Sequence, residues 1–260
     1  MARITLLTDF GTADAYTAAI KGVIASIAPD ASIDDAGHEL EPGAIMAAAW
    51  ALRRFWRLYP AGTVHLVVVD PGVGSERRAL AARADDRLFV APDNGVLSHV
   101  AADAAAFDCV AIENQAYLRA HRSATFHGRD VFAPAAAHLA CGVELDRLGP
   151  PVDNPLLLLW PEPARAAQGA DGEVVHVDRF GNLTSNIPAD WVTDQDLVWI
   201  GDRVIGPLRR AYSDVEPGEL VALIGSEDFV EVAARDGNAA AELEAGRGTA
   251  VRTRRGSLSL

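Results

Sequence analysis

The sequence predicts an α/β protein: an N-terminal, mainly parallel sheet covered by helices, followed by a small C-terminal β-barrel. Two observations support this fold class. Apolar strand-like runs alternate with amphipathic helical patterns over roughly the first 150 residues, as expected of βαβ units. Beyond residue 172 the chain changes to short β-like pieces with frequent turns and no helical periodicity, which is typical of a small, mostly antiparallel barrel or sandwich.

The N-terminal half opens with the apolar run ITLLTDFG, which reads as a buried strand ending in a turn. A helix follows and ends at Pro29, with an apolar stripe of Tyr16, Ile20, Val23, Ile24 and Ile27. A short strand around Ile33 then leads to a second helix starting at Pro42. That helix has its own stripe: Ile45, Ala48, Ala49, Leu52, Phe55, Trp56 and Tyr59.

The strongest strand signal is TVHLVVVD, residues 63–70. Its uninterrupted apolar run predicts burial on both faces, and hence a central parallel strand. RLFVAP and FDCVAI continue the alternation. Asp130 is placed to cap a helix that runs through VFAPAAAHLA toward Gly142.

The chain changes character near Pro150. We expect an N-terminal domain at 1–152, a linker at 153–172 and a barrel domain at 173–260. Five prolines, an apolar LLLLW patch and a small polar stretch lie between Pro150 and Gly172, as in a connection between domains. The barrel is expected from the strand-like segments EVVHVD, NLTSNI, LVWI, LVALIG, FVEVAA and TAVRT.

Composition narrows the classes of partner. The net charge of −13 argues against nucleic acid or an anionic membrane, because binding phosphates needs clustered Lys and Arg. The chain has no apolar run long enough to span a bilayer and no N-terminal signal stretch, so we expect a cytoplasmic protein. Cys109 and Cys141 stand where small buried packing residues are expected.

Two carboxylates flank the first turn. Asp9 follows the first strand in TDFGTADAY, and Asp14 precedes the next helix. A carboxylate at the carboxyl end of a first strand is well placed to accept both hydroxyls of a ribose, so we interpret Asp9 as a ligand residue rather than a turn former. Asp14 suits a helix cap as well as a ligand contact. The segment lacks the glycine spacing and the lysine of a phosphate loop.

Two segments about fifty residues apart combine ionisable side chains with glycine-rich backbone. VVVDPGVGSERR carries Asp70 and Arg77, and TFHGRD carries His127. An acid, a fixed cation and an imidazole in one pocket can hold and deprotonate a water molecule. An Asp and an Arg around a glycine turn also fit a structural ion pair, and the residues alone leave both interpretations open.

A metal-dependent hydrolase is an alternative interpretation of the acidic residues. Asp34, Asp35 and His38 follow the second strand, and oxygen and imidazole ligands suit a catalytic metal. Further ligands are available in Asp9, Asp70, Asp93 and His127. No tight ligand spacing such as HxH or HExxH joins these residues, so we expect no metal.

The barrel half carries one compact motif, VDRFGNLTSNIP. Asp178 ends a strand and Phe180 is placed to stack on a flat ring. Asn182 offers a donor and an acceptor, which suits an adenine edge. A plain β-turn with FGN at its tip explains the same residues equally well.

Together these segments closely resemble the S-adenosyl-L-methionine (SAM) hydroxide adenosyltransferases, the SAM hydrolases related to the fluorinase and chlorinase. The resemblance rests on motifs in one order along nearly the whole chain: TDFGTADAY with KGVI, GTVHLVVVDPGVGSERR, FVAPDNGVL, TFHGRDVFAPAAAHLA and VDRFGNLTSNI. It implies an α/β domain followed by a β-barrel, in a homotrimer that holds SAM between neighbouring subunits. It also implies hydrolysis of SAM, as substrate and without a further cofactor, to adenosine and L-methionine.

The resemblance further implies residue roles. Asp70, Arg77 and His127 match the family's catalytic triad. The matching SAM-binding residues are Asp9 at the ribose, Asp14 near the methionine amine, Phe126 as a pocket aromatic, Asp178, Phe180 and Asn182 from across the interface, and Ser226 near the methionine carboxylate.

The sequence departs from the family pattern in two places. Glu227 stands where the halogenating relatives have an arginine, which leaves open how the methionine carboxylate is held. Gly37 stands where a threonine is usual, and we assign no role to the neighbouring His38.

Two other activities are compatible with the same pocket. A halogenating enzyme needs a dry halide site, so the charged triad favours water as the nucleophile. A non-catalytic SAM or adenosine sensor would bind without turnover.

Overall fold

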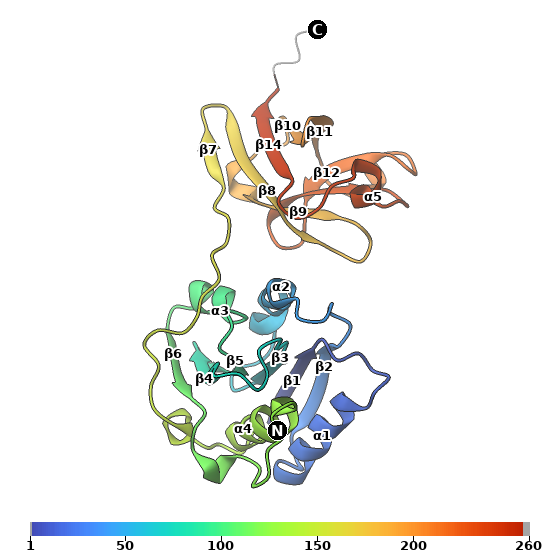
Figure 1. Ribbon diagram of the computed structural model, residues 1–260. Helices are drawn as coiled ribbons and strands as arrows, with labels where there is room; N and C mark the ends of the chain where they lie inside the picture. The colour runs from blue at the N-terminus through green and yellow to red at the C-terminus, as the bar shows by residue number, and fades with distance from the viewer. Residues whose placement is uncertain (1, 257–260) are drawn as a thin grey trace. The chain divides into compact units, whose positions relative to one another are not determined.

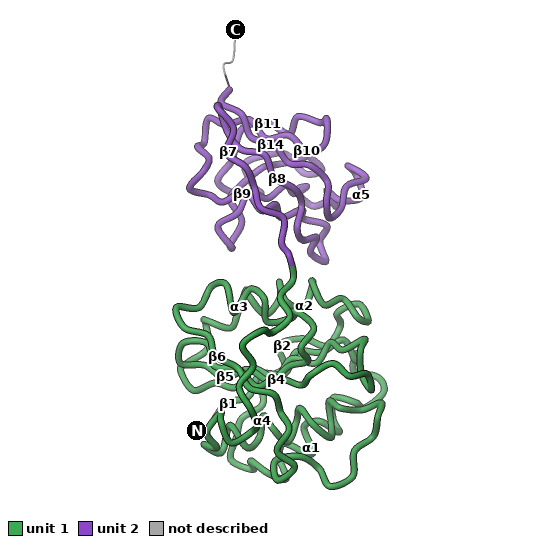
Figure 2. The backbone as a smooth tube through the Cα atoms, turned by 60° about the vertical axis from the view of Figure 1, so that its left-hand side comes forward, with its two compact units in different colours: residues 1–158 green, residues 159–260 purple. Residues whose placement is uncertain are grey.

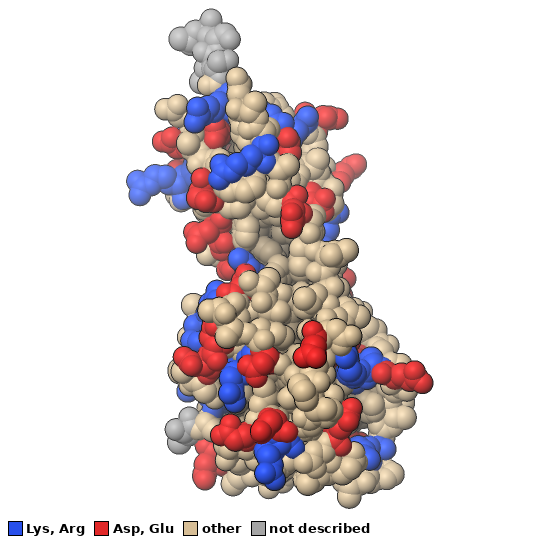
Figure 3. Space-filling view, turned by 90° about the vertical axis from the view of Figure 1, so that its left-hand side faces the viewer, with Lys and Arg blue, Asp and Glu red and all other residues tan. Residues whose placement is uncertain are grey.

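The computed structural model describes residues 2–256, which divide after Leu158 into two compact units (Figure 2). Each unit has its own buried apolar core and is described by itself. On the face shown in Figure 3, acidic and basic side chains are interspersed over both units.

The first unit is built on one sheet in the order β2-β1-β3-β5-β4-β6. Its strands are β1 (Arg3–Thr8), β2 (Ser32–Gly37), β3 (Val64–Val68), β4 (Ala79–Ala84), β5 (Arg87–Pro92) and β6 (Phe107–Ala111). Pairing is parallel from β2 through β5, and β4 is antiparallel to both of its neighbours. All of β3 is buried, which confirms the predicted central strand. Strand β4 was not expected, because its alanines carry little strand preference.

Helices cover both faces of this sheet (Figure 1): α1 (Tyr16–Ile27) and α4 (Ala133–Ala140) on one side, α2 (Ile45–Phe55) and α3 (Ser98–Asp103) on the other. A π-helical turn, Gly128–Phe132, leads into α4. Short 3-10 turns occupy Trp56–Leu58, Gln115–Tyr117, Leu145–Leu148, Ala189–Trp191 and Tyr212–Asp214. Of the helices between residues 2 and 256, none is long and apolar enough to cross a membrane.

The helix starts differ from expectation. Ala15, in the left-handed conformation, precedes α1 without a side-chain cap, so Asp14 is not a helix cap. Helix α2 begins at Ile45, three residues after Pro42. Asp130 lies inside the π-helical turn, and its carboxylate accepts the Ser123 amide N–H instead of capping a following helix. Side-chain oxygens bond whichever amide the local backbone offers, and sequence alone does not reveal which one that is.

Two side chains are more exposed than predicted. Tyr16 begins α1 with 48% of its surface exposed, outside the buried stripe to which the periodicity assigned it. Cys109 is buried as expected, whereas Cys141, just after α4, is exposed.

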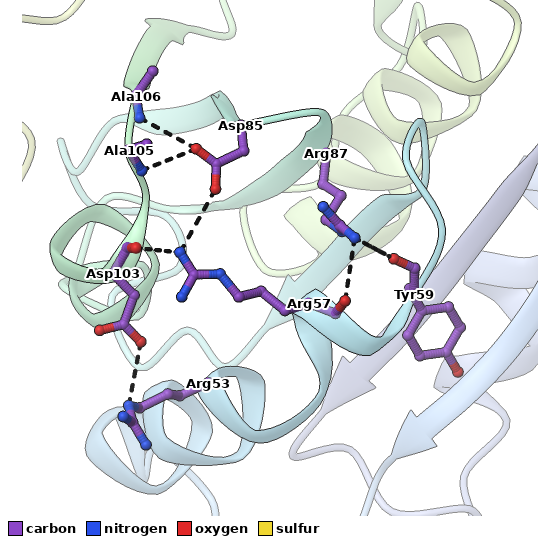
Figure 4. A network of polar contacts seen from close by, with 8 residues as sticks. All are labelled: Arg53, Arg57, Tyr59, Asp85, Arg87, Asp103, Ala105 and Ala106. Carbon is purple, nitrogen blue, oxygen red and sulfur yellow. Dashed lines mark hydrogen bonds and ion pairs between the residues drawn. The ribbon is translucent and has the colours of Figure 1, made fainter.

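Arginines tie together the sheet edge at which the parallel strands begin (Figure 4). Asp103 at the end of α3 pairs with Arg53 of α2 and accepts from Arg57 through its carbonyl. Arg57 also pairs with Asp85 in the β4–β5 turn, and Arg87 donates back to the carbonyl of Arg57. This network fixes the amino edge of the sheet and leaves the carboxyl edge available for chemistry.

The second unit is a closed barrel. Its strands are β7 (Ala164–Ala166), β8 (Gly169–Val177), β9 (Leu183–Pro188), β10 (Asp196–Ile200), β11 (Arg203–Arg209), β12 (Leu220–Ile224), β13 (Phe229–Ala234) and β14 (Ala250–Arg255), with one short helix, α5 (Ala239–Leu243). The order β14-β10-β11-β12-β13-β9-β8-β7 closes where β14 also pairs with β8. All pairings are antiparallel except β11 with β12. The predicted barrel is therefore confirmed.

The second half of the expected linker 153–172 is strand. The second unit begins at Leu159, and β7 and the start of β8 form a hairpin inside that range. The small and polar residues of this range are typical of a linker, but they also suit a short, mostly exposed edge strand such as β7. Strand β11 was also unexpected, because Gly206 and Pro207 in its interior indicate a turn.

Candidate active site

Three parallel strands deliver residues to one edge of the first sheet. Asp9 follows β1, His38 follows β2 and Asp70 follows β3. The chain passes from β1 to β2 through α1 on one face of the sheet, and from β2 to β3 through α2 on the other. The helix that follows β1 and the helix that precedes β3 therefore lie on opposite faces of the sheet, and the strand order reverses between these two strands. Open α/β sheets bind ligands in the crevice at such a switch point.

Asp70, Arg77 and His127 are in contact. Arg77 Nε donates to Asp70 Oδ1 over 3.0 Å, and its Nη2 donates to Asp70 Oδ2. The same Nη2 lies 2.9 Å from His127 Nδ1. Only 5% of the Asp70 side chain and 11% of the Arg77 side chain are exposed. The two loops, fifty residues apart in the sequence, thus meet around one guanidinium.

The contact with Arg77 defines the state of His127. A guanidinium can only donate hydrogen bonds, so Nδ1 of His127 is the acceptor and carries no proton. Burial lowers the pKa of His127, and the positive charge of Arg77 lowers it further, against the opposing effect of Asp70. The ring is therefore neutral near pH 7, with its proton on Nε2.

Two features hold the loops against each other. Gly74 has a φ of 80°, and a Cβ there would lie 2.6 Å from the carbonyl oxygen of Ala124. Asp130 is fully buried beneath the second loop, where it accepts 2.7 Å bonds from Arg129 and a 2.8 Å bond from the Ser123 amide. Burial alone would raise the pKa of Asp130, but the bonds from Arg129 and Ser123 outweigh it and the pKa is lowered. Arg129 and Asp130 thus form an ion pair.

A cleft of about 450 Å³ opens beside Asp70. Asp9 lines it, and one Asp9 carboxylate oxygen accepts the Gly43 amide over 2.7 Å. This partner is 34 residues away, so Asp9 does not serve merely to close its own turn. The remaining lining residues are Phe10, Tyr16, Pro42, Gly43 and Pro71.

An aromatic cluster adjoins the cleft. Phe126 packs edge-on against Tyr16 at 5.2 Å and against Phe10 at 6.1 Å between ring centroids. The three rings border a further hollow of about 400 Å³ with Ser123, Thr125 and Arg129. Sequence reasoning missed Phe10 and Tyr16 as site residues. The available signal was their position beside Asp9 and Asp14 in one strand-to-helix turn.

The triad also borders a cavity of about 480 Å³ that does not include the cleft residues. Arg77 and His127 line this cavity, whereas Asp70 lines the cleft. Polar side chains form part of its wall, including Glu76, Glu113 and Gln115. The triad therefore borders two hollows that share no lining residue.

Most of the carboxylates considered as metal ligands are paired with cations. Asp34 pairs with Arg3, and Asp35 accepts a 2.6 Å bond from Lys21. Asp93 accepts a 2.6 Å bond from Arg78. Between residues 2 and 256 there is no group of three or more His, Cys, Asp or Glu side chains that could hold a metal ion.

In the barrel unit, Asp178 organises the FGN turn. Its Oδ1 accepts the amides of Phe180 and Asn182 over 2.8 and 2.9 Å, and its Oδ2 accepts Asn182 Nδ2 over 2.9 Å. The Phe180 ring is 68% exposed. Ser226 is exposed in the turn between β12 and β13. The turn thus presents a flat apolar ring and an amide oxygen on a fixed backbone.

Two family descriptions match most of the chain. Residues 4–149 match the SAM hydroxide adenosyltransferase N-terminal domain, and residues 172–252 match the C-terminal domain of the same family.

Curated proteins from several organisms are similar over nearly their full length. An (R)-S-adenosyl-L-methionine hydrolase of Salinispora tropica is 40% identical over 91% of this chain and 92% of its own. One from Thermus thermophilus is 40% identical over 97% of this chain and 99% of its own. A fluorinase of Actinopolyspora mzabensis is 25% identical over 97% of both chains.

A solved structure agrees in fold. The crystal structure of an uncharacterized conserved protein from Thermotoga maritima superposes with a TM-score of 0.91 at 38% identity, over 97% of this chain and all of that one.

Proposed function

The chain belongs to the SAM hydroxide adenosyltransferase family, and from this premise we propose that it hydrolyses SAM to adenosine and L-methionine. The observation that carries the proposal is the contact of Asp70, Arg77 and His127 beside the cleft at the carboxyl edge. The higher identity to hydrolases than to fluorinases supports water over halide as the nucleophile.

In this proposal the cleft holds the nucleoside. Asp9 accepts the ribose hydroxyls, and the rings of Phe10, Tyr16 and Phe126 surround the bound molecule. Asp14, exposed just before α1, faces the methionine amine and complements its positive charge. Binding in this way brings C5′ of SAM next to the triad, which turns the attack into a step within one complex.

The reaction is a displacement at C5′. A water oxygen forms a bond to C5′ while the C5′–S bond breaks, and that electron pair stays on sulfur as the thioether of methionine. The sulfonium is already a good leaving group, so the residues act mainly on the nucleophile. Arg77 stabilises the negative charge that develops on the attacking oxygen.

The proton goes to Asp70 in this scheme. Nδ1 of His127 already accepts from Arg77 and Nε2 is already protonated, so the ring can gain a proton only by losing that contact. Each carboxylate oxygen has two lone pairs, so Asp70 can accept from water while it stays paired with Arg77. His127 then acts by keeping the guanidinium in place.

We further propose a cytoplasmic homotrimer in which the barrel of one subunit completes the cleft of a neighbour. Phe180 would stack on adenine, with Asp178 and Asn182 at its edge and Ser226 near the methionine carboxylate. The exposed Phe180 ring on a rigid turn supports this role, because a large exposed aromatic on ordered backbone is typical of a recognition surface.

Product analysis tests the reaction. Purified protein is incubated with SAM, alone and with fluoride or chloride, and the products are separated by chromatography. We expect adenosine and methionine in all cases. A 5′-halo-5′-deoxyadenosine would make the protein a halogenase, and SAM binding by calorimetry without any product would make it a sensor. Loss of activity on chelation would support the metal alternative.

A further inference from the structure

His38 is a buried imidazole at the carboxyl edge that the reaction above does not use. Only 6% of it is exposed. Its Nδ1 lies 2.9 Å from the Thr8 hydroxyl, and that hydroxyl accepts the amide N–H of Phe10 over 3.3 Å. These two contacts thus link His38, just after β2, to the backbone of Phe10, which lines the cleft.

The other side of the ring faces a carboxylate. His38 Nε2 lies 3.0 Å from Asp35 Oδ1, and Lys21 donates to Asp35 Oδ2 over 2.6 Å. The ring thus lies between the Thr8 hydroxyl and the Asp35 carboxylate. Thr8 in turn keeps a lone pair for the Phe10 amide.

These contacts converge on the turn Asp9–Gly11. Besides the Thr8 bond to Phe10, the Gly11 amide donates to the His38 carbonyl over 2.7 Å. Gly11 has a φ of 63°, a conformation that side-chain-bearing residues rarely adopt. The turn is therefore fixed from the β2 side, while Asp9 itself accepts from Gly43.

We propose that His38, acting through Thr8, is a positioning residue that holds Asp9 and Phe10 in the geometry that binds the nucleoside of SAM. The proposal rests on the proposed function for the identity of the ligand. The triad residues come from the loop after β3 and from the start of the π-helical turn, and not from the turn Asp9–Gly11. Loss of the His38–Thr8 contact should therefore weaken substrate binding and leave the chemical step nearly unchanged.

The same sheet contains a matched control. Thr5, three residues earlier on β1, has its hydroxyl 2.8 Å from Nδ1 of His65 on β3. Both threonines and both histidines are at most 6% exposed. Thr5 lies inside β1 and not at its end. A Thr→Val change at either position removes one buried Thr–His contact, but only Thr8 also contacts the cleft backbone.

The test compares Thr8→Val, Thr8→Ser and Thr5→Val with the wild type. Steady-state kinetics give KM and kcat for SAM, and hydrogen exchange followed by mass spectrometry reports the amides of residues 9–11. For Thr8→Val we expect KM to rise about tenfold with kcat within about threefold, and exchange at residues 9–11 to accelerate. Thr8→Ser, which keeps the hydroxyl, and Thr5→Val should match the wild type in both measurements. If Thr8→Val shows no cooperative unfolding transition, His38→Gln takes its place.

The proposal is overturned if Thr8→Val and Thr5→Val behave alike, or if kcat falls while KM and exchange stay unchanged. Hydrogen exchange does not require turnover, so it tests the positioning role even if the wild type has no SAM hydrolase activity. That last result would contradict the proposed function instead.

Discussion

Arg77 organises the triad because one guanidinium reaches both partners. It forms a two-point pair with Asp70 and contacts His127 through the nitrogen that also serves Asp70 Oδ2. Its guanidinium carbon also lies 5.0 Å from the centre of the Phe132 ring and makes a cation–π contact with it. A planar fork of donors is specific to arginine. Arg77 therefore holds a permanent positive charge in a fixed orientation.

Because Asp70 and His127 have different roles in the proposed reaction, we expect their substitution to lower kcat by different amounts. In His127→Asn the amide oxygen can replace Nδ1 as acceptor for Arg77, so kcat should fall only about tenfold. Asp70→Asn removes the proton acceptor and the negative charge that pairs with Arg77, so kcat should fall by at least about a thousandfold. Adenosine formation measured by chromatography gives both rates, and calorimetry checks that SAM still binds. Equal losses in the two variants would contradict the assignment of the proton to Asp70.

His65 makes folding sensitive to acid. Burial lowers its pKa to about 3, whereas in the unfolded chain a histidine titrates near its ordinary value of about 6.5. The unfolded state therefore binds more protons below that value, so stability is complete above it and falls as the pH drops toward about 3.

We expect the wild type to lose about 2 kcal/mol of unfolding free energy between pH 7 and pH 5 through this group. His65→Phe should remove that part of the pH dependence, even if its stability at pH 7 is lower. Urea unfolding at several pH values measures both slopes. Parallel pH profiles for the two proteins would show that His65 does not titrate in this way.

At the residue scale, the types and flanking glycines of Asp70, Arg77 and His127 pointed to chemistry but left a structural ion pair open as well. The family resemblance favoured a triad, and the hydrogen bonds that join the three side chains became visible only in the structure. The state of the His127 ring depends on a contact across fifty residues. Tyr16 was misassigned because periodicity places it on the buried face, whereas in the structure it is exposed and lines the cleft.

At the element scale, the site geometry depends on the close approach of two loops. The carbonyl of Ala124 comes close enough to Gly74 that no side chain fits between them. The parallel strands fix where each loop begins, and this contact fixes how far Arg77 reaches toward His127. Loops held on a rigid scaffold in this way commonly carry catalytic residues.

Gly74→Ala should therefore separate the two loops. We expect turnover to fall at least about tenfold, because a displacement near 1 Å is costly in a catalytic site. Gly62→Ala is the control: Gly62 also has a positive φ, 78°, but a Cβ there would meet nothing within 4 Å. Both variants carry backbone strain, and only the first carries the clash. Similar turnover in the two variants would show that the Gly74 contact does not set the site geometry.

Helices and strands with a strong local sequence pattern were predicted, and those with a weak pattern were missed. Strand β3 was predictable because a short, continuous apolar run rich in valine is typical of a strand buried on both faces. Strands β4, β7 and β11 were missed because none has a clear strand pattern. β4 is rich in alanine, β7 is short and mostly exposed, and β11 contains an internal Gly-Pro pair. Pairing with neighbouring strands stabilises all three. The cap at Asp130 failed because its carboxylate bonds Ser123 and Arg129 instead, and Asp14 makes no cap because α1 starts after Ala15 without a side-chain cap bond.

At the scale of the whole molecule, the proposal divides one site between two units that come from different subunits. The triad belongs to the first unit and the FGN turn to the second. The sequence indicated both units through the change in periodicity near Pro150. It could not indicate how copies of the chain assemble, because that depends on complementarity between surfaces rather than on local pattern.

Mixed assemblies test the shared site. Asp70→Asn and Phe180→Ala each damage a different half of it, so each variant alone should be nearly inactive. In a randomly mixed trimer with sites between subunits, about a quarter of the sites combine two intact halves. Co-expressed or re-associated variants should therefore recover about a quarter of wild-type turnover. No recovery would indicate a site made within a single chain.

The most direct test of the central claim follows the oxygen atom. SAM is hydrolysed in water enriched in heavy oxygen, and the adenosine and methionine are analysed by mass spectrometry. Attack of a triad-held water at C5′ predicts one heavy oxygen in adenosine, at its 5′ position, and none in methionine. Adenosine without the label, or label in methionine alone, would contradict the account.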